Sequence, residues 1–88
     1  MTGFEYITWK DAVSEDPWCH RSEITPHFHT IESVGFLVDE SDDVVTLALN
    51  HDQDGDNLSC VMHIPKVMII HRVALEQFIP LIETAIKA

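Results

Sequence analysis

The chain has 88 residues, and its fifteen acidic and five basic side chains give a formal net charge of -10 at pH 7. A chain of this length forms one small domain with a limited core, so a second copy or a partner is an expected source of stability. The negative charge repels nucleic-acid phosphates at long range, which argues against a general DNA-binding or RNA-binding protein.

The N-terminal third predicts a first strand followed by a long loop. Residues 4–9 alternate, with Phe4, Tyr6 and Thr8 on one face. Residues 10–13 predict one turn of helix. Residues 14–28 contain two prolines and no lasting periodicity, so they predict a long loop, and loops of that length in compact domains often carry function.

The middle of the chain predicts a β-hairpin. Residues 33–38 and 44–49 are rich in β-branched and apolar side chains, and five polar residues, 39–43, separate them. Period two places Val34, Phe36 and Val38 on one face, able to oppose Val45, Leu47 and Leu49. The second face is partly apolar as well, so we expect a cover on both sides: a helix, the far wall of a barrel, or another subunit.

A further strand, a corner and a last strand follow. Residues 58–64 alternate after a polar turn, and Pro65 should end their hydrogen-bond ladder. Residues 66–68 predict one tight turn, and residues 69–75 predict the last strand. This order is typical of SH3-like and Sm-like barrels, so the expected fold is one mainly β domain over residues 1–88, a small barrel of about five antiparallel strands.

The C-terminal segment predicts a helix over residues 76–88. Apolar residues recur at helical spacing, and Pro80 places the start of the regular helix at about residue 79 or 80. The helix packs either on its own barrel or on a neighbouring subunit. The apolar positions are Leu75, Phe78, Ile79, Leu81, Ile82, Ala85 and Ile86.

Three motifs carry a resemblance to known proteins. They are Asp11-Ala12-x-Ser14-x-Asp16-x-Trp18, His29-x-Ile31-x-Ser33-Val34-Gly35-Phe36-Leu37-Val38 and Ile64-Pro65-Lys66-x-Met68-Ile69. Together they resemble a group of small, acidic, largely uncharacterised proteins encoded by tailed bacteriophages. The resemblance covers most of residues 4–75 and implies no activity. Residues 19–29 and the tail after Leu75 are not typical of that group.

Two clusters suggest metals. Cys19, His20, His27 and His29 supply zinc-type ligands within eleven residues, although their spacing fits no standard zinc finger. We keep this His/Cys zinc site as an alternative. The motif Asp52-x-Asp54-Gly55-Asp56 is not an EF-hand, because its glycine is fourth and a histidine stands at position twelve, so we interpret it as an acidic turn.

Catalysis has no signature in this chain. It contains no nucleophile elbow, phosphate loop or glycine-rich dinucleotide turn, so we expect a non-enzyme without a cofactor. Cys19 and Cys60 do not make a disulfide framework, and we interpret both as small buried hydrophobic residues. The first thirteen residues lack the pattern of a signal peptide, and no apolar run has the ~20 residues that cross a bilayer. A reducing cytosol is therefore the expected compartment, and the bacteriophage resemblance implies that it is the cytoplasm of a bacterial host.

The remaining function class is binding. An aromatic ring stacks on a base and an arginine holds phosphate with two hydrogen bonds. Taken one at a time, each residue favours a structural role instead: Trp9 belongs to the core, Trp18 plugs the barrel end, and Arg72 pairs with a nearby acid. With the bacteriophage resemblance, these residues predict a homo-oligomeric counter-defence protein that sequesters a nucleotide-type immune signal. The candidate ligand-binding residues are Trp18, Arg21, His27, His29, Lys66 and Arg72.

A second hypothesis rests on the acidic side chains. An acidic surface that imitates the charge of nucleic acid predicts an inhibitor that binds a basic host protein. Its residues are Asp11, Glu15, Asp16, Asp39, Glu40, Asp42, Asp43, Asp52, Asp54 and Asp56. Such an association weakens with salt. Taken singly, these charges favour a solvated face that only confers solubility.

Overall fold

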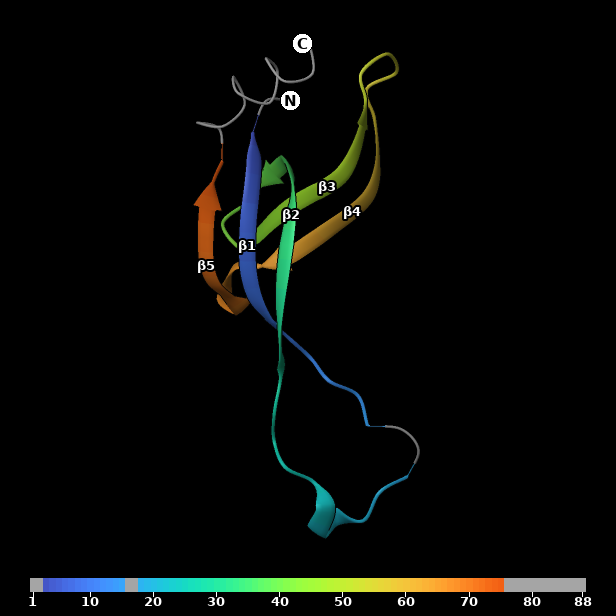
Figure 1. The fold of residues 1–88 in the computed structure, drawn as a ribbon, viewed down its shortest axis with the longest axis vertical. Helices are drawn as coiled ribbons and strands as arrows, with labels where there is room; N and C mark the ends of the chain where they lie inside the picture. Colours follow the sequence, from blue (N-terminus) through green and yellow to red (C-terminus); the bar gives the residue numbers. More distant parts are fainter. Residues whose placement is uncertain (1–2, 16–17, 76–88) are drawn as a thin grey trace, which may run out of the picture.

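The computed structural model describes residues 3–15 and 18–75, so the helix expected over residues 76–88 lies outside the described residues. One antiparallel sheet contains the five strands of the described residues, in the order β4-β3-β2-β1-β5 (Figure 1). This arrangement confirms a mainly β fold of five antiparallel strands. The elements are β1 (Phe4–Asp11), η1 (Arg21–Glu23), β2 (His29–Glu40), β3 (Val44–Asp52), β4 (Asn57–Pro65), η2 (Lys66–Met68) and β5 (Ile69–Ala74).

The ends of the strands follow the local chemistry of the chain. Pro65 is the last residue of β4, and η2 forms the tight turn expected over residues 66–68. The helical turn expected over residues 10–13 is wrong, because Lys10 and Asp11 continue β1 and pair with Thr30 and His29. Strand pairing therefore prevails over the weak local preference for a helical turn.

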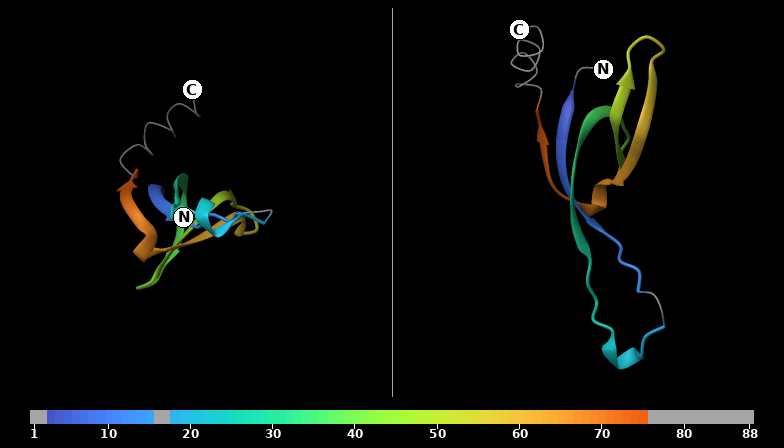
Figure 2. Two further views of the ribbon diagram at one scale, coloured as in Figure 1. Left: turned by 90° about the horizontal axis from the view of Figure 1, so that it is seen from below. Right: turned by 45° about the vertical axis from the view of Figure 1, so that its right-hand side comes forward.

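The sheet is open along two edges. The edge strands β4 and β5 are joined by η2, and within residues 3–15 and 18–75 no ladder pairs them with each other. Figure 2 shows the strands bending around a concave side. The described strands therefore form an open sheet, and their pairing does not support the expected closure into a barrel.

The core is small and lies on the concave side. Ile7, Val45, Leu47 and Ile64 are buried there, and Trp9 packs against them. Val45 and Leu47 are two residues apart on β3 and therefore share a face. Each buried aliphatic side chain stabilises the fold by about 1.5–3 kcal/mol, so a core of four such side chains makes only a small hydrophobic contribution to the free energy of unfolding.

The face of β2 that reaches the core differs from our expectation. Leu37, rather than Phe36, lies opposite Leu47, because Phe36 pairs with Ala48. A register shift between Leu37 and Asp39 follows. The second face then carries Phe4 and Phe36, whose ring centroids are 4.6 Å apart.

Gly35 provides a test of this packing. A Cβ at Gly35 would lie 2.7 Å from the carbonyl oxygen of Ala48, which is backbone of the neighbouring strand. We expect Gly35→Ala to lower the free energy of unfolding by about 1–3 kcal/mol, because β2 and β3 must move apart. Urea denaturation followed by circular dichroism measures this change.

Gly55→Ala is the matched control. A Cβ at Gly55 meets the side-chain amide of Asn57 at 2.6 Å, and that side chain is free to rotate away. Equal stabilities of the two variants would contradict the close approach of β2 and β3.

Candidate functional site

Four charged side chains form one ion-pair network across the sheet. On β5, Arg72 donates from Nε to Glu5 Oε1 at 2.6 Å and from Nη2 to Glu40 Oε1 at 2.6 Å. Lys66 in η2 places its Nζ 2.7 Å from Glu40 Oε2. Two of the expected ligand-binding cations therefore already hold carboxylates, and the alternative that Arg72 pairs with an acid is confirmed.

The network has a structural role because one of its acids is buried. The Glu5 side chain is 4% exposed, and Arg72 satisfies both of its oxygens. An unpaired carboxylate at such a site costs about 3–5 kcal/mol. Hydrogen bonds from Arg72 and Lys66 lower the pKa of Glu40 to about 2, and those to Glu40 and Glu5 raise the pKa of Arg72 above its usual value.

The most exposed part of the molecule is the connection between β1 and β2. We call its described residues, 12–15 and 18–28, the arm. The ladder between β1 and β2 ends at the pair Asp11 and His29, and the arm continues away from the sheet (Figure 1). None of its described side chains is buried, so the arm adds nothing to the core.

Local hydrogen bonds shape the arm. His20 caps η1, since its Nδ1 accepts from the backbone N–H of Ser22 at 3.2 Å. The Nδ1 of His27 lies 2.8 Å from the carbonyl oxygen of Thr25. These short-range contacts define a turn without any help from the sheet.

Four of the six expected ligand-binding residues lie on the arm or at its junction with β2: Trp18, Arg21, His27 and His29. The His27 and His29 rings are 6.1 Å apart between centroids. Trp18 is fully exposed, so its alternative role as a plug of the barrel end is wrong. The structure does not bring Lys66 and Arg72 to the arm, because both are held in the ion-pair network.

The zinc alternative gains no support from the geometry. In the described part of the chain, no three His, Cys, Asp or Glu side chains converge on one point. Cys19 and Cys60 are both free and exposed, so the interpretation of these cysteines as buried hydrophobic residues is wrong. His27 has a carboxylate neighbour instead, with its Nε2 4.0 Å from Glu15 Oε1.

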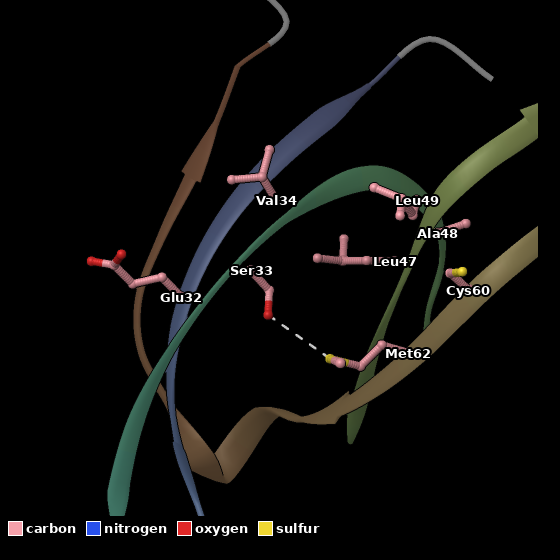
Figure 3. Close-up of a pocket in the computed structure, with 8 residues that line it drawn as sticks. All are labelled: Glu32, Ser33, Val34, Leu47, Ala48, Leu49, Cys60 and Met62. Atoms are coloured by element: carbon pink, nitrogen blue, oxygen red, sulfur yellow. Dashed lines mark hydrogen bonds between the residues drawn. The ribbon is translucent and has the colours of Figure 1, made fainter.

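The structure contains two hollows that the sequence did not predict. The first, which we call the β2–β4 groove, has a volume of about 260 Å³, and Figure 3 shows the residues that line it. Inside it, Ser33 Oγ donates to Met62 Sδ at 3.8 Å. Its lining residues are Glu32, Ser33, Val34, Leu47, Ala48, Leu49, Cys60 and Met62.

The second hollow lies where the arm meets the sheet, and we call it the arm-root cleft. It has a volume of about 250 Å³ and mainly apolar walls, which include Phe28 and Met68. The Lys10 ammonium stands 5.0 Å from the centroid of the Phe28 ring, a cation–π contact. Because its parts come from β1, the arm and η2, only the folded chain assembles this cleft.

Comparisons with family models, with curated protein sequences and with solved structures find no match to this chain. In the described residues, no helix is long and apolar enough to cross a membrane.

The ion-pair network predicts a defined acid sensitivity. The pKa of Glu40 is lowered from 4.5 to about 2 in the folded state, so its contribution to stability is complete above about pH 4.5 and is lost as pH falls toward 2. Glu40→Gln should therefore be less stable than the wild type at neutral pH. The stability difference should shrink between pH 4.5 and 2, as urea denaturation at several pH values will measure.

Asp42→Asn is the control, because Asp42 is an exposed acid in the same hairpin turn and lies outside the network. If Glu40→Gln keeps the full stability of the wild type at neutral pH, the ion pairs of Glu40 do not contribute to the stability of the fold.

Proposed function

We propose that the protein is a non-enzymatic binding module that recognises a protein partner with a basic surface through its arm. The observation that carries this proposal is the exposure of large apolar side chains on the arm. Trp18 is 102% exposed, Ile24 53% and Phe28 52%. Side chains of this kind are the usual anchors of protein interfaces, where a few aromatic residues supply most of the affinity.

The energetics of the arm favour a bound state. Moving a large apolar side chain out of water stabilises a complex by about 1.5–3 kcal/mol, and the sheet leaves Trp18 and Ile24 in water. Since the arm projects from the sheet, a partner can surround these side chains without disturbing the core (Figure 1). The arm therefore supplies binding energy that folding does not use.

The charge of the chain selects the kind of partner. A net charge of -10 attracts a basic surface and repels an acidic one, and this steering raises the rate of association at low salt. Glu15 and Glu23 place acidic side chains beside the apolar ones on the arm. This combination supports the acidic inhibitor of a basic host protein over a nucleic-acid binder.

Sequestration of a nucleotide-type signal is the second candidate. Its support is that Trp18, Arg21, His27 and His29 share one region of the chain. It is the weaker of the two, because Glu5 and Glu40 occupy the guanidinium of Arg72 and Glu40 also occupies Lys66. A phosphate group at either cation would have to displace a carboxylate.

The biological setting is part of the same proposal. The resemblance to bacteriophage proteins favours a counter-defence role in the cytoplasm of the bacterial host. A homo-oligomer would add to the small core, as expected for a chain of this size. In this setting the basic partner is a host protein.

Trp18→Ala tests the arm as the recognition element. Tagged full-length protein is recovered from bacterial cells at low and at high salt, and bound proteins are quantified by mass spectrometry. We expect basic proteins to be enriched by the wild type and reduced at least about tenfold by Trp18→Ala, since an aromatic anchor carries 1.4 kcal/mol or more. High salt should release the same proteins.

Val61→Ala is the matched control, because Val61 is an exposed apolar residue on β4, away from the arm. It should retain the wild-type set of bound proteins. Recovery of one unchanged set by the wild type and Trp18→Ala would refute the proposal.

Heat release tests the nucleotide candidate separately. Purified protein is denatured by heating, and the supernatant is analysed by ultraviolet absorbance and mass spectrometry. The protein-binding proposal predicts no released nucleotide. The wild type could instead release a cyclic nucleotide or an ADP-ribose derivative that Trp18→Ala does not release. That result would contradict the protein-binding proposal and would indicate that the arm binds a nucleotide.

A further inference from the structure

The β2–β4 groove is an uncovered continuation of the core. Leu47, Leu49 and Met62 face the concave side, because Leu47 pairs with Met62 and Leu49 is two residues along β3. Leu47 is buried, whereas Leu49 is 62% and Met62 42% exposed. Figure 3 shows these side chains around the hollow that β2 arches over. The core therefore ends abruptly at Leu47.

This uncovered surface calls for an apolar cover. Two large side chains on the core face of a sheet remain in water, although their burial would stabilise the fold by about 1.5–3 kcal/mol each. Among residues 3–15 and 18–75, no segment buries Leu49 or Met62. A cover for these two side chains would therefore come from residues outside these ranges or from another molecule.

Leu75, the last described residue, lies at the level of this groove. The Leu75 N–H donates to the carbonyl oxygen of Phe4 at 2.8 Å. Phe4 pairs with Phe36, Phe36 with Ala48, and Ala48 lines the groove. One row of paired residues therefore connects the start of the C-terminal segment with the groove.

The segment is long enough to reach the groove. Three steps between neighbouring strands separate β5 from β3, which is roughly 14 Å at about 4.8 Å a step. Residues 76–88 number thirteen and span ~20 Å at the rise of an α-helix, and more when extended. Neither a second copy nor a swapped element is needed to bring them there.

The chemistry of the segment matches the groove. Its apolar residues recur at helical spacing and form one stripe, as noted above, and include Phe78, Ile79, Leu81 and Ile82. We propose that residues 76–88 bind in the β2–β4 groove of their own chain, with this stripe against Leu49 and Met62. This docking surface is separate from the arm and leaves the arm free for a partner.

Cys60 reports on the groove in the unaltered protein. Cys60 lines the groove and Cys19 lies on the arm, and both are exposed in the described residues. Docking predicts that Cys60 in the full chain reacts with a maleimide roughly tenfold more slowly than Cys19, since reaction then requires the segment to open. Ile82→Asp should restore fast reaction at Cys60 and leave Cys19 unchanged. Equal rates at the two cysteines in the wild type would overturn the proposal.

Cross-linking tests the same contact without weakening it. In full-length Cys19→Ser protein, Ile82→Cys should form a disulfide with Cys60 under a mild oxidant such as diamide, and the product should keep the mass of one chain. Glu83→Cys is the control, because residue 83 lies off the apolar stripe. A disulfide of two chains, which would indicate a second copy, or none from Ile82→Cys, would overturn docking within the chain.

Discussion

The fold depends on the guanidinium of Arg72, which joins parts of the chain far apart in sequence. It satisfies the buried carboxylate of Glu5 on β1 and reaches Glu40 at the end of β2. Lys66 binds the same Glu40 through its Nζ, and its backbone N–H donates to Asp43. The corner at η2 and the edge strand β5 are thus held against the β2–β3 hairpin. The ion-pair network and the core together close this end of the concave side, whereas the other end opens into the β2–β4 groove.

The sequence predicted the positions of most strands, but it did not predict which face of β2 packs in the core. Pro65 marks the end of β4 because proline lacks a backbone donor, and the structure places it there. Period two did not identify the core face of β2, since both faces are apolar. Leu37 reaches Leu47 because of the register of the hairpin, and a register depends on pairing between strands rather than on either strand alone.

The candidate site shows the same limit more strongly. Lys66 and Arg72 looked available for phosphate, but their carboxylate partners are distant in sequence: Arg72 lies 67 residues from Glu5 and 32 from Glu40. No local pattern reports such a pairing. The sequence also did not predict the exposure of Trp18, because a tryptophan in a loop can either plug the end of a barrel or serve as an exposed anchor for a partner. The long loop of residues 14–28 was the useful signal, and the arm occupies it.

The arm contributes little to the stability of the sheet. Since none of its described side chains is buried, substitutions between residues 18 and 28 cost the sheet little free energy. Under the proposed function, the binding residues of the arm can therefore change while the sheet stays constant, since loops vary more than the elements they connect. The same independence makes this connection a natural place to graft foreign binding loops onto a domain of fewer than ninety residues.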